Sequence, residues 1–109
     1  VSDHFLSSVL DREARASTLL DDKIAIPHPL GPVAVRTAVS VAIFPEGIKW
    51  DSGKQVKLVF MLAISEDQFI DSMLIYDFLT NILDDDIIEK ISQCKNYNEF
   101  ITASKKYLL

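Results

Sequence analysis

The sequence has little of what several classes of site require. Its one cysteine, Cys94, excludes an internal disulfide, and its place near an expected helix end favours packing over reactivity. Metal sites need clustered ligands, which two distant histidines and one cysteine do not supply, so we expect no metal and no cofactor. No apolar run is long enough to span a bilayer, and no basic-then-apolar leader begins the chain. We therefore expect no membrane insertion.

Basic residues are also scarce. Sixteen acidic residues outnumber eleven basic ones, which gives a formal net charge of −5. Binding of nucleic acid needs a basic face, and the only adjacent basic pair is Lys105-Lys106. The charge argues against direct nucleic-acid contact by this domain. It favours a protein partner with basic residues, held by an attraction that salt weakens.

Apolar residues are abundant and make up 49% of the 109 residues. That is enough for one hydrophobic core, so we expect a single domain over residues 1–109. The chain begins at Val1 without an initiator methionine, and we expect it to be part of a longer protein.

Periodic patterns predict a helix, then strands, then further helices. Ser2-Asp3 is typical of a helix cap, and apolar residues at helical spacing predict a first helix through about residue 14. A polar link over residues 21–23 should lead into a strand over residues 24–27. A strand over residues 38–44 should break at Pro45, before a short segment over residues 48–50.

The run from Val56 to Ile64 is almost continuously apolar, which is typical of a central strand covered on both faces. Ser65 to Gln68 form a capping box that opens a helix through about Leu83. This helix should pack on the sheet through a wide apolar stripe: Phe69, Ile70, Met73, Leu74, Phe78, Leu79 and Ile82.

Two more helices follow in the pattern. Asp84 to Asp86 should cap the first, and the second should extend over residues 96–109. The last helix should turn four side chains inward: Tyr97, Phe100, Ile101 and Leu108. Together the elements indicate an α/β fold, a three-layer α/β/α domain with a mixed central sheet flanked by helices.

The segment from Lys23 to Pro29 contains the most distinctive residue. Pro27 ends the apolar stretch because it lacks a backbone donor. His28 follows, and Pro29 pushes it toward an extended conformation. Sheet proteins often place their chemistry at strand ends, although a turn that happens to contain histidine explains the stretch equally well.

Three spaced features, the pair Arg12-Glu13, the pair Ser17-Thr18 and the apolar strand ending in Pro27-His28, closely resemble one family. It is the enzyme IIA domain of the mannitol/fructose class, from the bacterial phosphoenolpyruvate-dependent sugar phosphotransferase system. The resemblance covers essentially the whole chain, but the strand and helix that usually precede the Arg-Glu pair are absent. It implies a cytoplasmic domain that accepts a phosphoryl group on His28.

The sequence departs from the transport members of that family in two places. The link before the strand has no glycine, and Gln68 stands where those domains have a second histidine. These departures, together with Trp50 and its neighbours and with Pro29, resemble the enzyme IIA-like C-terminal module of BglG-type antiterminators. Such regulators contain phosphotransferase regulatory domains.

The resemblance also assigns roles. A neutral imidazole is nucleophilic near neutral pH, which suits His28 as the acceptor. Arg12 offers a planar fork for phosphate oxygens, and the hydroxyls of Ser17 and Thr18 can donate to the same oxygens. The helix that begins near Gln68 offers free amides, and the resemblance adds Gln68 to the expected phosphate-binding residues.

Each of these assignments has an alternative. Arg12 could form only a surface ion pair. Ser17 and Thr18 are equally typical of turns, and Gln68 is fully explained as a capping residue. We assign no role to His4 and expect Trp50 to be a packing anchor.

Three functions remain open. In the preferred one, the domain is a regulatory module: phosphorylation by, or docking of, HPr or enzyme IIB proteins alters upstream regulatory domains of the same chain. Alternatively, it is an enzyme IIA transport component, a phosphohistidine phosphotransferase that passes phosphate from HPr to a fructose/mannitol-type enzyme IIB. The third is a plain interaction domain in which His28 is inert. The sequence does not identify the sugar.

Overall fold

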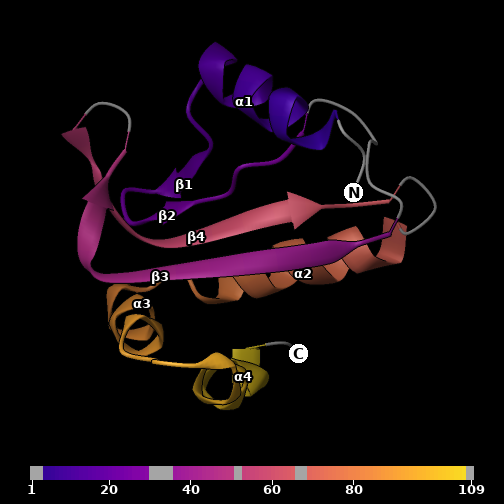
Figure 1. Ribbon diagram of the computed structural model, residues 1–109. Helices are drawn as coiled ribbons and strands as arrows, with labels where there is room; N and C mark the ends of the chain where they lie inside the picture. Colours follow the sequence, from indigo (N-terminus) through magenta and orange to yellow (C-terminus); the bar gives the residue numbers. More distant parts are fainter. Residues whose placement is uncertain (1–3, 30–35, 51–52, 66–68, 108–109) are drawn as a thin grey trace.

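The computed structural model describes residues 4–29, 36–50, 53–65 and 69–107. In chain order the elements are α1 (Phe5–Arg15), β1 (Leu19–Asp21), β2 (Ile24–Ala25), β3 (Ala38–Lys49), β4 (Gln55–Ala63), α2 (Phe69–Asn81), α3 (Asp85–Ser92), α4 (Tyr97–Ser104) and the 3-10 helix η2 (Lys105–Tyr107). The strands form one sheet in the order β1-β2-β4-β3, with α1 on one face and α2, α3 and α4 on the other (Figure 1). The predicted three-layer α/β/α architecture is confirmed.

The sheet is mixed, as expected. β4 pairs in parallel with β2, where Ile24 lies opposite Leu58, and antiparallel with β3, where Val41 lies opposite Phe60. Because β2 and β4 run in the same direction, their carboxyl ends lie at the same edge of the sheet. In Figure 1, α2 begins beside that edge.

The main core lies between the sheet and the helices α2 and α3. Alternate residues of β4 point into it, and Leu58, Phe60 and Leu62 are at most 1% exposed. The other core side chains come from β2, α2, its following residue and α3: Ile24, Phe78, Leu79, Ile82, Ile88 and Ile91. On the opposite face, a smaller cluster joins α1 to the end of β4. The expectation that β4 is covered on both faces is confirmed at that end.

β3 differs from the predicted strand. The expected break at Pro45 is wrong, because β3 continues to Lys49 with irregular pairing between Ile43 and Ile48. Gly47, at φ +82°, lies in the left-handed region that favours glycine. A bulge on an edge strand tolerates proline, so the chain bends without leaving the sheet.

The polar link before β2 is also different from the expectation. Leu19–Asp21 forms β1, which pairs antiparallel with β2. The regular part of β2 is shorter than the predicted strand and ends at Ala25. Two further backbone bonds extend the pairing: the N–H of Ile26 donates to Thr18 O at 3.0 Å, and that of Leu62 donates to Pro27 O at 2.9 Å.

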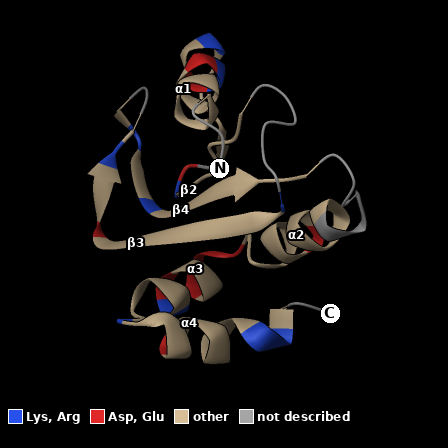
Figure 2. Ribbon diagram, turned by 45° about the vertical axis from the view of Figure 1, so that its right-hand side comes forward, with Lys and Arg blue, Asp and Glu red and all other residues tan. Residues whose placement is uncertain are grey.

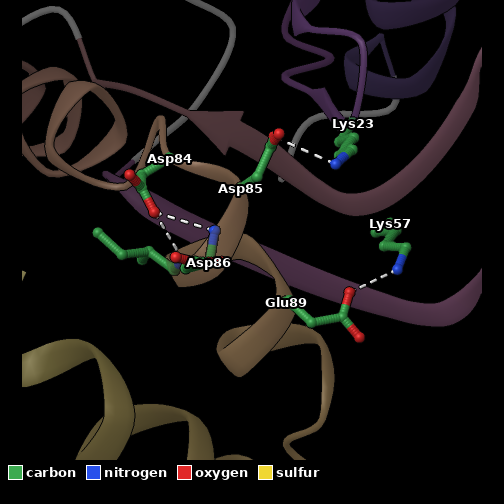
Figure 3. A network of polar contacts seen from close by, with 7 residues as sticks. Lys23, Lys57, Asp84, Asp85, Asp86 and Glu89 are labelled. Carbon is green, nitrogen blue, oxygen red and sulfur yellow. Dashed lines mark hydrogen bonds and ion pairs between the residues drawn. The ribbon is translucent and has the colours of Figure 1, made fainter.

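The predicted cap of α3 is confirmed. The Asp84 carboxylate accepts hydrogen bonds from the N–H groups of Asp86 at 2.9 Å and Ile87 at 3.1 Å. Two ion pairs connect this helix to the sheet, Lys23 with Asp85 at 3.1 Å and Lys57 with Glu89 at 2.6 Å (Figure 3). These pairs are partly exposed and contribute little to stability.

Several apolar side chains point elsewhere than predicted. Tyr97, expected inward, is 76% exposed, and Met73 and Leu74 of the expected stripe are about half exposed. The reason is that α2 and α4 do not close over β3: an apolar cavity of about 670 Å³ lies between them, and Leu74 and Tyr97 line it. Phe100 and Ile101 are partly buried, as expected. The predicted contributions of Phe69, Ile70 and Leu108, and the Ser2-Asp3 cap, lie outside the described side chains.

Charged residues do not gather into one basic face in the described part of the chain (Figure 2). The basic pair Lys105-Lys106 lies on η2, far along the chain from the basic residues of α1. Among the described helices, none is long and apolar enough to cross a membrane. The described residues contain no group of three or more His, Cys, Asp or Glu side chains that could hold a metal ion.

Candidate functional site

His28 lies just beyond the carboxyl end of β2, on a segment whose backbone is fixed from both sides. Ile26 is hydrogen-bonded to Thr18 next to β1, and Pro27, which is buried, is hydrogen-bonded to Leu62 of β4. The imidazole itself is half-buried. The sequence therefore placed His28 correctly at a strand end, and the neighbouring strands hold it there.

The imidazole has a defined orientation. Nδ1 of His28 lies 2.8 Å from the carbonyl oxygen of Ile26. A carbonyl oxygen can only accept, so the proton of the neutral ring is on Nδ1. The other nitrogen, Nε2, then has a free lone pair, which is the form that a nucleophile requires.

Arg12, in the last turn of α1, turns toward the end of its own helix. Its guanidinium donates to the carbonyl oxygen of Ala16 at 2.7 Å. A guanidinium has five N–H donors in a planar fork, so this bond uses only part of its capacity. Because basic residues stabilise the carboxyl end of a helix, the contact also has a structural explanation.

Ser17 and Thr18 form a turn between α1 and β1. The Ser17 hydroxyl oxygen accepts from the N–H of Leu19 at 3.3 Å, a local turn contact. Thr18 is only 4% exposed, and its hydroxyl donates to Glu13 at 2.5 Å. To bind phosphate as predicted, the Thr18 hydroxyl would have to leave Glu13, whereas the Ser17 hydroxyl keeps its proton available.

Glu13 was quoted from the sequence only as part of the Arg12-Glu13 pair and was given no role. Its carboxylate accepts three hydrogen bonds: from Thr18 Oγ1, from the N–H of Thr18 at 2.9 Å and from Trp50 Nε1 at 3.1 Å. Trp50, which was expected only to pack, is thus also a donor. The adjacent Arg-Glu pair was visible in the sequence, but no local pattern connects Glu13 with a tryptophan that follows the edge strand.

The environment of Glu13 favours its charged form. Burial on its own would raise the pKa of this carboxyl, but the hydrogen bonds from the Thr18 hydroxyl, the Thr18 amide and Trp50 outweigh it, with help from the charge of Arg12. The pKa of Glu13 is consequently held below its ordinary value of 4.5. The carboxylate is therefore ionised, and an acceptor only, at neutral pH.

This arrangement predicts an acid-dependent part of the stability. A lowered folded-state pKa stabilises the fold above the ordinary value, and the contribution is lost as the pH falls through the lowered value. Urea unfolding of the wild type and of Glu13→Gln should therefore differ most above about pH 5 and converge in more acidic buffer. Glu89→Gln is the control: Glu89 is exposed, so its substitution should have the smaller effect. A pH-independent difference for Glu13→Gln would contradict the prediction.

Gln68 and the expected capping box lie in residues 66–68, outside the described residues. The helix that they were expected to open, α2, starts at Phe69, and its beginning lies at the sheet edge from which His28 extends (Figure 1). The apolar cavity near α4 is lined by none of the candidate residues that the structure describes, Arg12, Ser17, Thr18 and His28. The chemistry suggested by His28 therefore belongs to the sheet edge and not to that cavity.

Comparisons with known proteins identify the family and the fold. The family model described as "Phosphoenolpyruvate-dependent sugar phosphotransferase system, EIIA 2" matches residues 1–106. The probable licABCH operon regulator of Bacillus subtilis is 30% identical over 98 residues, which cover 89% of this chain and 15% of the regulator. The mannitol-specific phosphotransferase enzyme IIA component of the same organism is 26% identical over 108 residues, 93% of this chain and 71% of that protein.

A solved structure supports the fold. The complex of enzyme IIA for mannitol and phosphorylated enzyme IIB from Escherichia coli matches with a TM-score of 0.79 at 22% identity. The match covers 97% of this chain and 76% of the related one. The chain spans only a small part of the curated regulator, and about three quarters of the solved enzyme IIA chain.

Proposed function

Because this chain belongs to the EIIA type 2 family of the phosphoenolpyruvate-dependent sugar phosphotransferase system, we propose that Nε2 of His28 accepts a phosphoryl group from a phosphohistidine donor. The observation that carries the proposal is the hydrogen bond from Nδ1 of His28 to Ile26 O at 2.8 Å. It holds the proton on Nδ1 and leaves the lone pair on Nε2. The site lies at the shared carboxyl edge of β2 and β4, where sheet proteins bind ligands.

The proposed reaction is an exchange of one N–P bond for another. The Nε2 lone pair attacks phosphorus in line, the donor's N–P bond breaks, and the donor imidazole leaves with that electron pair. His28 keeps its Nδ1 proton throughout, so its ring becomes positively charged when phosphorylated. The Ile26 carbonyl oxygen stabilises that charge, because hydrogen bonds to charged groups are stronger than neutral ones.

Incubation with phosphoenolpyruvate, enzyme I and HPr tests the proposal. The domain should gain the mass of one phosphate, labile in acid, on the peptide that contains His28. A domain that stays unmodified while enzyme I phosphorylates HPr, or a phosphate on another peptide, would reject it.

Arg12 is proposed to bind the phosphate oxygens after it exchanges its contact with Ala16. A hydrogen bond to a charged group contributes about 1.5–3 kcal/mol, so Arg12→Ala should lower the phosphorylation rate about tenfold or more. Arg12→Lys should recover only part of it, because the fork is lost. Arg15→Ala, on the same helix, is the control and should keep the rate. Equal rates for the folded wild type and Arg12→Ala would remove Arg12 from the site.

We further propose that the domain acts in the cytoplasm, where phosphoenolpyruvate is made, as the regulatory module of a longer transcription regulator. Its partners would be HPr and enzyme IIB proteins together with regulatory domains of the same chain. The relative among operon regulators supports this role. The similarity to a mannitol-specific enzyme IIA component supports a second candidate, a transport component that delivers phosphate to an enzyme IIB.

Gln68 separates the two candidates. Glutamine can donate a hydrogen bond to a neighbouring phosphate, but it cannot carry the positive charge that a second histidine could. Onward transfer of labelled phosphate from the purified domain to a set of enzyme IIB proteins should therefore be slow, and Gln68→His should speed it. Rapid transfer by the unmodified domain would favour the transport component.

A further inference from the structure

A continuous series of hydrogen bonds connects Trp50 with the imidazole of His28. Trp50 Nε1 donates to Glu13, which also accepts from the amide and hydroxyl of Thr18. The Thr18 carbonyl oxygen accepts from the N–H of Ile26 at 3.0 Å. The Ile26 carbonyl oxygen accepts from Nδ1 of His28 at 2.8 Å. The N–H and the carbonyl oxygen of Ile26 thus both belong to this series of hydrogen bonds.

The position of Glu13 is unfavourable for its own helix. Glu13 lies in the last turn of α1, where the helix dipole disfavours a negative charge. Its carboxylate is half-buried and is stabilised by donors from a buried threonine and from a tryptophan beyond the edge strand. A residue that served only helix formation would not need three donors from two other parts of the chain.

We propose that Glu13 is a positioning residue for His28. By holding Thr18, it fixes the direction of the Ile26 peptide groups, and these keep the imidazole in the form with the proton on Nδ1 and the lone pair on Nε2. The inference deepens the proposed function, because it assumes that Nε2 of His28 is the acceptor. Glu13 does not touch the reacting atoms and acts only through Thr18 and Ile26.

Glu13→Gln and Thr18→Val test this with the whole domain. Each substitution keeps the approximate shape of the side chain. Glu13→Gln removes the charge, and Thr18→Val removes the hydroxyl. Glu89→Gln is the matched control, since Glu89 is also a hydrogen-bonded glutamate with a lowered pKa, but it lies on α3 and contacts Lys57 and Gln93. Trp50→Phe removes a single donor and serves as the mild variant where the others unfold.

Two measurements are needed. The ¹⁵N shifts of the ring nitrogens give the tautomer of His28, with His4 as a second signal in the same spectra. Single-turnover transfer from phosphorylated HPr gives the rate. We expect the Nδ1–H form in the wild type and in Glu89→Gln, and a mixture of tautomers in the folded Glu13 and Thr18 variants.

The phosphorylation rate at saturating HPr should fall about tenfold to a hundredfold in those variants, because misplacing a reacting group by about 1 Å can lower a rate by that factor. The concentration of HPr at half-saturation should change little. Glu13→Gln combined with Thr18→Val should be little worse than the more affected single variant, because both break the same series.

An unchanged His28 tautomer and an unchanged phosphorylation rate in folded Glu13→Gln and Thr18→Val would overturn the inference. If only Trp50→Phe folds, the same result in that variant would overturn it. The tautomer measurement requires no phosphate, so it decides the positioning role even if the domain never accepts a phosphoryl group. Conversely, phosphorylation of His28 with full rates in every variant would leave the proposed function intact and reject only the role of Glu13.

Discussion

Replacing His28 by asparagine is expected to abolish phosphoryl acceptance while leaving the fold intact. The amide nitrogen of asparagine occupies about the position of Nδ1 and can still donate to Ile26 O, the partner of His28 in the wild type. It offers no nucleophilic lone pair in place of Nε2, so incorporation of phosphate from HPr should fall below detection. The free energy of unfolding, measured in urea, should stay within about 1 kcal/mol of the wild-type value, since the hydrogen bond is retained.

His4→Asn is the matched control for this experiment. His4 is the chain's other histidine, it is exposed, and it precedes the first helix, so its substitution should leave phosphate incorporation unchanged. Stoichiometric phosphorylation of the folded His28→Asn protein would refute His28 as the acceptor. Loss of phosphate incorporation in His4→Asn alone would mean that His4 is the acceptor.

The features that sequence reasoning predicted best are set by short-range chemistry. The apolar run that forms β4 could only be a central strand, and the Asp84 cap needs only the nearby amides of Asp86 and Ile87. The position of His28 likewise follows from its own neighbours: the regular part of β2 ends at Ala25, and Pro27, which has no N–H, lies directly before His28. Such signals depend on a few consecutive residues and survive in any tertiary context.

The features it missed depend on contacts between separate segments of the chain. Two aspartates disfavoured a strand before β2, yet β1 forms because Leu19 can pair with Ala25. Glu13 of α1 accepts a hydrogen bond from Trp50, which follows β3, and no spacing in the sequence reveals this contact. Tyr97 had the right period for the core but lies where α4 leaves β3 uncovered. Periodicity gives a face of the helix, but not how far the neighbouring elements close over it.

Truncating Phe60 should destabilise the domain strongly. Its ring is 1% exposed, and it meets Phe78 edge-on at 6.0 Å and Phe100 at 6.4 Å between centroids. Removing a buried phenylalanine ring costs about 3–5 kcal/mol, a large part of the roughly 5–15 kcal/mol that keeps a domain folded. Because Phe60 borders the apolar cavity, neighbouring side chains cannot easily close the added space. Urea unfolding of Phe60→Ala at neutral pH measures the loss.

Tyr97→Ala, the control for Phe60→Ala, removes an aromatic ring of similar size from the rim of the same cavity. Because Tyr97 is 76% exposed, its loss should change the free energy of unfolding by no more than about 0.5 kcal/mol.

β4 also anchors the His28 segment, since the N–H of Leu62 donates to Pro27 O. Phe60→Ala should consequently lower the extent of phosphorylation only as far as it lowers the folded fraction. A larger stability loss for Tyr97→Ala than for Phe60→Ala would mean that α4 packs through the opposite face.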